Sequence, residues 1–491
     1  MTMKSRKRKK EKKTTYRKPH SKRNREIILL SVFFTVLFCA MIGYMCNYVR
    51  NNEKDLMNNN YNARQALLAL ENTRGTIYDR NGEKLAYTQV DGETEVRVYP
   101  FSNMFSHVVG YSTKGKTGIE QMVNYYLINS NIPLSEKVEN DLAQKKNPGN
   151  EVYTTLDVEL QKIIYDSFGM YRGACIVSNV KTGEILALVS KPDFDPNTIV
   201  QDWDKYIEED SQKKNSVLLN RVTQGIYPPG STFKIVTALE YIKENNTSVD
   251  DYHYSCNGKF KHGDSKMQCY HAMAHGSEDF YDIFANSCNS AFASVGVALD
   301  RNQYGDTLET LLFNQELPID MNYSKSMITV DDSLTDDEMI QISIGQGKSQ
   351  ITPMHLNMIT SAIANDGVLM KPKFIDRVIA PNGSIIETFP AEEYKRLLSK
   401  EEADLMTELM VAVVNEGTAP KLKNAQYQAA GKTGSAEYNG VKEDSHAWFT
   451  GFAPADDPQI AITIIIESIG SGGDYSAPIA KRIFDAYLGY E

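Results

Sequence analysis

The sequence predicts a mixed α/β domain, in which helices cover both faces of a sheet, behind a single membrane-spanning helix. Residues 173–190 form two apolar runs separated by a short polar turn, the pattern of a buried hairpin. Strand-like runs return near the end of the chain, at 429–438, 447–454 and 459–468. Several helical stretches lie between these two groups of strands, and a last helix is expected over 476–490.

The N-terminus predicts a membrane anchor. Residues 1–26 hold 13 Lys and Arg against two Glu, a net charge of +11 in a chain whose total is −10, so the remainder carries −21. Residues 27–49 contain no charged side chain and are long enough to span a bilayer. The basic tail alone could indicate nucleic-acid binding, but beside such a segment it marks the cytoplasmic side. A cleaved signal peptide is the alternative; the long apolar segment and the lack of a small-x-small cleavage site favour an uncleaved anchor.

Residues 50–152 are expected to form a small membrane-proximal domain, called the pedestal domain here. A polar helix over 51–72 leads into a turn and hairpin at 74–86. Residues 110–117, Gly-Tyr-Ser-Thr-Lys-Gly-Lys-Thr, formally match the phosphate-binding Walker A pattern, and 106–110 could be the preceding strand. The extracellular location and the lack of a later apolar strand ending in Asp argue against nucleotide binding.

Residues 228–245, PPGSTFKIVTALEYIKEN, carry the first candidate for chemistry. Ser231 and Lys234 lie three apart where a Pro-Gly stop gives way to an apolar helical run, so both side chains share one face. A serine hydroxyl becomes a nucleophile when a nearby base takes its proton, and a desolvated lysine can be that base. The pattern predicts a serine acyl-transfer site. An ordinary helix N-cap at Ser231 is the alternative.

Two further motifs decide between these interpretations. Ser-x-x-Lys also occurs at Ser178 and Ser211, so by itself it is weak. Only Ser231 is followed in order by Ser287-Cys288-Asn289 and then by Lys432-Thr433-Gly434, the ordered signature of penicillin-recognising serine enzymes. Small residues around Lys432, including Gly434 and Ser435, leave room for an extended peptide along that strand.

The chain after the anchor resembles class B penicillin-binding proteins, and within them the short penicillin-binding protein A type. The resemblance rests on five blocks: RGTIYDRNGEKLA, GACIVSNVKTGEILALVSKPDFDPN, NRVTQGIYPPGSTFK, ISIGQGKSQITPMH and HAWFTGFAP. It implies that residues 153–491 form a serine transpeptidase and β-lactamase-like domain with an antiparallel sheet flanked by helices. It also implies a peptidoglycan D,D-transpeptidase in the bacterial cell membrane, single-pass, with the catalytic domain outside.

The same resemblance implies a role for each catalytic residue. Ser231 attacks the carbonyl of the penultimate D-Ala of a stem peptide, with Lys234 as its base. Ser287 and Lys432 relay the proton to the departing D-Ala, and Asn289 holds Lys234 and an amide of the stem.

The substrate-binding residues follow on the same strand. Lys432 and Thr433 bind the terminal carboxylate, and the backbone amides of Ser231 and Ser435 form the oxyanion hole. Gly434, which lies between Thr433 and Ser435 in the sequence, leaves space for the peptide. No metal or organic cofactor is required and no nucleic acid is expected. The implied partners are stem peptides, β-lactams, the membrane through residues 27–49, and a glycosyltransferase of the wall-synthesis machinery.

Rival functions share this fold. A class A β-lactamase needs a deacylating Glu, typically in a Glu-x-x-Leu-Asn box, and the nearest stretch, Glu309 to Asn314, is one residue too long. Class D β-lactamases and their related sensors have Val where this chain has Asn289. An idle scaffold conflicts with the complete set of motifs. A D,D-carboxypeptidase stays open, because the motifs do not distinguish hydrolysis from cross-linking.

The chain has six cysteines, of which two lie in the anchor. Cys256 and Cys269 bracket a polar stretch, with His271 and His275 just beyond. Outside the cell a disulfide between Cys256 and Cys269 is expected. Free thiols are the second interpretation, and a zinc site is the third, because the spacing lacks the short Cys pair of most structural zinc sites.

Overall fold

The structure is a computed structural model that describes residues 21–52, 63–92, 94–211, 216–424, 426–437 and 444–490. It divides into two compact units, Met1–Asn62 and Ala63–Glu491, and each is described by itself.

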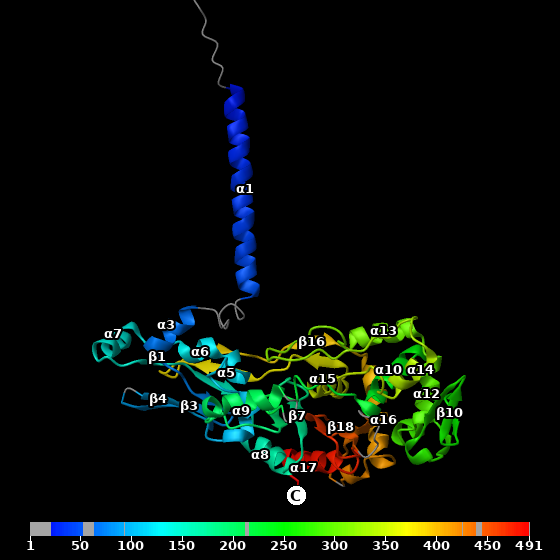
Figure 1. Ribbon diagram of the computed structural model, residues 1–491. Coiled ribbons are helices and arrows are strands. Elements are labelled where there is room, and N and C mark those ends of the chain that lie inside the picture. Colours follow the sequence, from blue (N-terminus) through cyan, green and yellow to red (C-terminus); the bar gives the residue numbers. More distant parts are fainter. Residues whose placement is uncertain are drawn as a thin grey trace, which may run out of the picture. The chain divides into compact units, whose positions relative to one another are not determined.

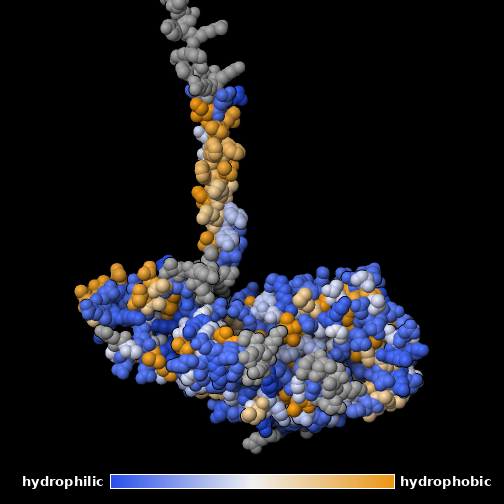
Figure 2. Space-filling model, in the orientation of Figure 1, coloured by the Kyte–Doolittle hydropathy of each residue, from blue (hydrophilic) through white to orange (hydrophobic). Residues whose placement is uncertain are grey.

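The first unit contains helix α1 (Ser21–Asn51), whose surface is apolar over most of its length (Figure 2). Within Asn24–Asn51, an 18-residue window has a mean hydropathy of 2.5. At 1.5 Å per residue these 28 residues extend for about 42 Å, more than the roughly 30 Å hydrocarbon core of a bilayer. In the described part of the chain, α1 is the one helix long and apolar enough to cross a membrane. The predicted span, residues 27–49, lies within it.

The second unit is built on a five-stranded sheet in the order β17-β18-β19-β7-β8, with every neighbouring pair antiparallel. Its strands are β7 (Gly173–Asn179), β8 (Ile185–Lys191), β17 (Ala430–Ala436), β18 (His446–Ala453) and β19 (Ile460–Ile466). Nearly all of their residues are buried because both faces are covered, which explains the apolar runs in the sequence. The predicted α/β fold with an antiparallel sheet is confirmed.

Helices cover the two faces of this sheet (Figure 1). One face carries α8 (Val158–Phe168) and α17 (Ser476–Leu488), which contact each other as well as the strands. The other face carries α15 (Pro353–Ala364) and α16 (Lys400–Asn415), and α10 (Lys234–Glu244) packs against α16. α15 lies so deep that 11 of its 12 residues are buried, and it packs on β7, β18 and β19.

The second unit contains further elements besides the five-stranded sheet and the helices that cover it. Those nearest the catalytic motifs are η2 (Gly230–Phe233), α11 (Phe280–Ala285), α12 (Asn289–Ala298), α13 (Arg301–Thr310), α14 (Asp336–Ser343), and two small hairpin-like ribbons, β9 (Tyr254–Cys256) with β12 (Gly276–Glu278) and β10 (Lys259–His262) with β11 (Ser265–Gln268). The domain also contains α9 (Ile199–Ser211), β13 (Val368–Met370), β16 (Glu393–Arg396), η3 (Tyr270–Ala272) and η4 (Pro420–Leu422).

A second sheet has six strands in the order β15-β14-β6-β2-β3-β4, and residues 77–154 contribute four of them. Four strands come from the expected pedestal segment or its end: β2 (Ile77–Tyr78), β3 (Lys84–Asp91), β4 (Thr94–Val98) and β6 (Glu151–Thr154). The other two, β14 (Ile375–Ile379) and β15 (Ile385–Thr388), come from more than 200 residues later. β6 pairs with both groups, parallel to β2 and antiparallel to β14. This region also holds α3 (Ala63–Glu71), β1 (Asn72–Thr73), η1 (Ser102–Phe105), α4 (Ser106–Val109), α5 (Gly118–Met122), α6 (Asn124–Ile128), α7 (Leu134–Leu142) and β5 (Asn147–Pro148).

A buried ion cluster joins elements of the pedestal region. The carboxylate of Glu120 is fully buried and accepts hydrogen bonds from Arg74 Nε and Arg97 Nε, each at 2.7 Å. Tyr99 Oη donates to the same carboxylate at 3.1 Å. Burial acts to raise the pKa of Glu120, but the two guanidinium charges outweigh it and lower that pKa. The cluster therefore holds β4, α5 and the start of the predicted hairpin together.

The Walker A match at residues 110–117 has no phosphate-loop context. The residues before it form helix α4 (Ser106–Val109) instead of a strand. At Gly110, where φ is +81°, an added Cβ would lie 2.1 Å from Thr117 O, so the chain folds back on itself there. The loop thus differs from the strand–loop–helix geometry that cradles phosphates.

Candidate active site

Ser231 and Lys234 lie at the start of α10, where the chain enters the helix through the 3₁₀ turn η2. Side chains three residues apart eclipse one another in a 3₁₀ turn, so both face the same side. Lys234 is fully buried and Ser231 is partly exposed. Among the described residues none forms a hydrogen bond with Ser231 Oγ, which leaves this hydroxyl accessible for a reaction.

Three oxygen atoms surround the amine nitrogen of Lys234. Its Nζ donates to Ser287 O at 2.7 Å, to Ser287 Oγ at 3.1 Å and to Asn289 Oδ1 at 2.7 Å. The structure therefore brings together the first two predicted motifs, 53 residues apart in the chain. Burial lowers the pKa of Lys234 to about 7, so a large fraction of this amine is neutral near neutral pH. A neutral, positioned amine can act as a general base.

The turn between α11 and α12 presents Ser287 to this lysine. Ser287 has φ +54°, in the left-handed region that a non-glycine residue rarely adopts. Its N–H donates to Phe284 O at 3.2 Å, and the N–H of Cys288 donates to Ile283 O at 2.9 Å. The strained conformation is thus held by the end of α11, and it directs both the carbonyl and the hydroxyl of Ser287 at Lys234.

The third motif lies on β17, at the free edge of the central sheet. Lys432 is fully buried, with its Nζ 3.3 Å from Thr433 O and 5.6 Å from the ring centre of Phe284. Burial, and after it the charge of Lys234, lowers the pKa of Lys432 well below its usual value. Thr433 Oγ1 is 2.6 Å from Thr418 Oγ1. Sequence reasoning did not identify Thr418, which has no motif of its own beyond the Glu-Gly-Thr stretch before η4.

Glycines let β17 approach the nucleophile turn. A Cβ on Gly434 would lie 3.0 Å from Thr232 Cγ2 and 3.2 Å from Pro229 O. Gly230 has φ +55°, and a Cβ there would lie 2.8 Å from Ser435 O. The predicted residues Gly434 and Ser435 are therefore adjacent to the turn that carries Ser231. All three motifs meet at one place, beside β17, the end strand of the sheet that the described residues form.

The competing matches lie elsewhere. Ser178 is buried on β7, where its Oγ donates to Asn357 Oδ1 at 2.7 Å. Lys181-Thr182-Gly183 is the turn between β7 and β8, closed by the side chain of Asn179, which accepts from the N–H groups of Lys181 and Thr182. The side chains of Ser211 and Lys214 lie outside the described residues.

The cysteines of the catalytic domain are free thiols in the structure. Cys256 Sγ and Cys269 Sγ are 3.7 Å apart. His275, which the sequence placed near this pair, lies beside them, and so does Cys288, which the sequence did not connect with them. The disulfide between Cys256 and Cys269 therefore stays a prediction from sequence.

Family models match most of the chain. The model described as "Penicillin binding protein transpeptidase domain" matches residues 173–485, and the one described as "Penicillin binding protein A dimerisation domain" matches residues 74–152. The first alone spans more than half of the chain.

Curated and solved relatives agree with these matches. The chain is 29% identical to the peptidoglycan D,D-transpeptidase PbpA of Mycolicibacterium smegmatis over 458 residues, covering 87% of this chain and 91% of the relative. It is 30% identical to the peptidoglycan D,D-transpeptidase MrdA of Acinetobacter baumannii over 467 residues, covering 82% and 68%. Among solved structures, the imipenem acyl-enzyme complex of penicillin-binding protein A from M. tuberculosis superposes with a TM-score of 0.76 at 26% identity, covering 85% of this chain and 99% of that one.

Proposed function

This chain belongs to the penicillin-binding protein transpeptidase family, and on that premise we propose that it is a peptidoglycan D,D-transpeptidase that cross-links stem peptides ending in D-Ala-D-Ala. It is a serine-type acyl-transferase, and it binds β-lactams covalently. The observation that carries the assignment of residues is the contact of buried Lys234 with both Ser287 and Asn289, beside the free hydroxyl of Ser231.

The acylation step starts at Ser231. Its Oγ attacks the carbonyl carbon of the penultimate D-Ala while the neutral amine of Lys234 takes the hydroxyl proton. The backbone N–H groups of Ser231 and Ser435 stabilise the negative charge on the carbonyl oxygen. The close approach of β17 to η2 at Gly230 supports this pairing of amides.

The leaving D-Ala needs a proton at its nitrogen. The ammonium of Lys234 contacts Ser287 Oγ at 3.1 Å, so the proton can pass through this hydroxyl, with Lys432 on the other side of the relay. The C–N bond breaks, D-Ala departs as a free amine, and an ester to Ser231 Oγ remains. An amine from a neighbouring stem peptide then attacks this ester, forms the cross-link amide and returns the proton to Ser231.

Lys432 and Thr433 are proposed to bind the terminal carboxylate of the donor stem. Burial, and after it the charge of Lys234, lowers the pKa of Lys432 well below its usual value in the empty site. An arriving carboxylate favours the charged amine, so the ion pair forms together with the substrate.

A D,D-carboxypeptidase is the second candidate, because water could resolve the same ester. The free edge of β17 favours cross-linking, since it can take an extended peptide. Incubation of the full-length protein in detergent with stem pentapeptide, with and without an acceptor amine, separates the two. A transpeptidase gives the cross-linked product in the presence of the acceptor, and D-Ala release without cross-links would assign the hydrolase.

The membrane arrangement and the partner are also proposals. The net charge of +11 on residues 1–26, which precede the apolar part of α1, supports a cytoplasmic N-terminus and a catalytic domain outside, by the positive-inside rule. We further propose that residues 50–152 act as a pedestal for a transpeptidase domain over 153–491. A glycosyltransferase of the wall-synthesis machinery is the proposed partner, because glycan strands must be made where their stems are cross-linked.

The assignment of the nucleophile is tested with fluorescent penicillin. Full-length protein should be labelled covalently, and Ser231→Ala should abolish the label. Ser178→Ala is the matched control, because Ser178 heads a second Ser-x-x-Lys match but is bonded to Asn357. Label that survives in Ser231→Ala, or that disappears in Ser178→Ala with the protein still folded, would refute the assignment.

A further inference from the structure

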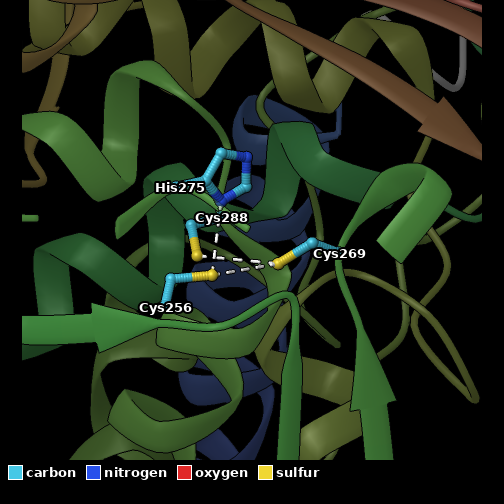
Figure 3. A group of neighbouring side chains, drawn as sticks. All are labelled: Cys256, Cys269, His275 and Cys288. Carbon is cyan, nitrogen blue, oxygen red and sulfur yellow. Dashed lines mark hydrogen bonds between the residues drawn. The ribbon is translucent and has the colours of Figure 1, made fainter. Parts of the chain in front are cut away.

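Four side chains with metal-ligating atoms converge next to the Ser287–Asn289 turn (Figure 3). Cys256 ends β9, Cys269 follows β11, His275 precedes β12, and Cys288 caps α12. The three Sγ atoms and the imidazole nitrogen all lie within 4.8 Å of one another. The three cysteines are buried and His275 is mostly buried, so the cluster is closed to solvent.

Three of the six separations between the ligand atoms fit the edges of a tetrahedron around one zinc ion, and the other three are within 4.8 Å. With Zn–S bonds of about 2.3 Å and a Zn–N bond of about 2.0 Å, tetrahedral angles place two sulfurs about 3.8 Å apart and a sulfur and a nitrogen about 3.5 Å apart. Cys269 Sγ lies 3.7 Å from both Cys256 Sγ and Cys288 Sγ. Cys256 Sγ lies 3.4 Å from His275 Nδ1. Three thiolates and one imidazole form a ligand set that zinc adopts in structural sites.

Neighbouring groups are arranged to stabilise thiolates. The backbone N–H of Gly258 points at Cys256 Sγ at 3.4 Å, and that of Ser290 points at Cys269 Sγ at 3.5 Å. The hydroxyl of Ser290 lies 3.1 Å from Cys269 Sγ. Donors to ligand sulfurs and fixed ligand orientations are characteristic of the shell around a metal site.

The spacing of the four residues in the sequence did not indicate a metal site, because one ligand, Cys288, comes from the catalytic turn. The order Cys-x12-Cys-x5-His-x12-Cys contains no short Cys pair. The antiparallel pairing of β9 with β12 places Cys256 opposite Gly276, next to His275. Cys288 arrives from the catalytic turn itself. Two other arrangements compete: a disulfide using two of the thiols, and unmetallated buried thiols with His275 turned to Glu278, whose Oε1 is 3.9 Å from Nδ1.

We propose that Cys256, Cys269, His275 and Cys288 bind one Zn²⁺ ion as a closed structural site. Binding releases the three thiol protons to solvent. A disulfide would use only two of the three thiols, and it would leave the third thiol and the imidazole of His275 without a ligand bond. One zinc ion can bind all four groups. Soft thiolate ligands select zinc over Mg²⁺ and Ca²⁺, which prefer oxygen.

The zinc ion would position the catalytic turn. Cys288 lies between Ser287 and Asn289, the two residues that hold Lys234. Asn289 also donates from Nδ2 to Gln268 O at 3.1 Å, directly before Cys269. A metal at this point therefore ties the β9–β12 segment to the turn, and it limits the movement of both contacts to Lys234. This consequence for acylation rests on the proposed function, whereas metal binding itself does not.

Metal content tests the site directly. Full-length protein is purified in detergent without an immobilised-metal column or chelator, and zinc is measured by inductively coupled plasma mass spectrometry. We expect about one zinc per chain. His275→Ala and Cys256→Ser should lose most of it. The matched controls are His271→Ala, an exposed histidine nearby, and Cys175→Ser, a buried cysteine on β7, and both should keep it.

Thiol counting keeps the test decisive if a variant does not fold. Wild-type protein is denatured with a chelator and without reductant, then alkylated and analysed by mass spectrometry. Six modified cysteines together with bound zinc in the native protein support the site. Four modified cysteines, from an oxidised pair, would overturn it, and so would six modified cysteines in a native protein that contains no zinc and takes up none when it is added.

Acylation of zinc-depleted protein tests the positioning role. Removal of zinc should slow penicillin acylation by about tenfold or more, with recovery on addition of Zn²⁺ but not Mg²⁺. An unchanged rate in folded, zinc-free protein would overturn this role. Acylation that persists in zinc-replete Ser231→Ala would refute the proposed function and leave metal binding untouched, so the two failures are distinguishable.

Discussion

The acylation rate should follow the protonation state of Lys234. This amine is fully buried, and burial lowers its pKa to about 7. At pH 7.4 a lysine with that pKa is about 70% neutral, against about 0.1% for an ordinary lysine, so burial raises the amount of base by roughly a thousandfold. Only the neutral amine can accept the proton of Ser231. The second-order rate should therefore rise with pH and level off above about pH 8.

The size of the acid limb follows from the same pKa. Between pH 7.4 and pH 5 the neutral fraction falls about seventyfold, and the acylation rate should fall with it, because no other step before acylation uses this proton. Stopped-flow measurement of fluorescent penicillin binding to full-length protein from pH 5 to 9 gives the profile. Intrinsic fluorescence at each pH confirms that the protein remains folded.

Two variants on α10 serve as controls. Lys234→Ala should remove acylation at every pH, because the hydroxyl loses its proton acceptor. Lys243→Ala, two turns farther along the same helix, should keep the wild-type profile. A flat profile from pH 5 to 8 in folded protein, or a midpoint near the pKa of a free lysine, would refute the conclusion that Lys234 is a buried, neutral base.

Three further outcomes are expected. The penicilloyl ester should persist for many minutes, as followed by mass spectrometry. The reason is that Glu309, which begins the stretch most similar to the deacylation box of class A β-lactamases, is exposed on α13. Hydrolysis of the ester within seconds would indicate a β-lactamase. Lys432→Ala should slow acylation roughly ten- to a hundredfold, the effect of about 1.5 to 3 kcal/mol from one charge-assisted hydrogen bond, and Lys432→Arg should lose less. If Lys432→Ala has no acylation and Lys234→Ala keeps it, the base and the anchor are exchanged. Glu120→Gln should lower the free energy of unfolding by about 3 to 5 kcal/mol, because it leaves two guanidinium groups without their buried counter-charge. Denaturant unfolding measures this, with Glu139→Gln on exposed α7 as the control. Equal stability of the two variants would contradict the prediction.

The sequence alone indicated the strands of the central sheet and the place of the catalytic motifs. β7, β8, β17, β18 and β19 are each apolar or small-residue runs bounded by turn residues, so local pattern was sufficient to find them. The order of the three motifs also separated Ser231 from Ser178, although both head a Ser-x-x-Lys match. The structure shows the physical difference: Ser178 Oγ is buried and bonded to Asn357, whereas Ser231 Oγ is free among the described residues.

The sequence could not give the pairings that depend on distant segments. β14 and β15 join the pedestal sheet because β14 pairs with β6 across more than 200 residues, and the apolar pattern of a strand does not specify its partner. The left-handed conformation of Ser287 is likewise invisible in the sequence, since it is imposed by the end of α11. The contact of Thr418 with Thr433 is equally invisible in the sequence. The N–H of Thr418 donates to Ala285 O at the end of α11, and this hydrogen bond between distant segments helps to hold Thr418 beside β17.

The sequence by itself determined which residues are available for chemistry: the serine, the two lysines, the Ser-x-Asn turn and the cysteines, each named by type and order. The tertiary structure decided which of them meet. It lowers the pKa of Lys234 by removing water from the amine, and it brings Cys288 to Cys256, Cys269 and His275 by folding β9 and β12 against the catalytic turn. Burial and distance are properties of the packed chain, and they decide whether a lysine is a base and whether four separate side chains form one metal site.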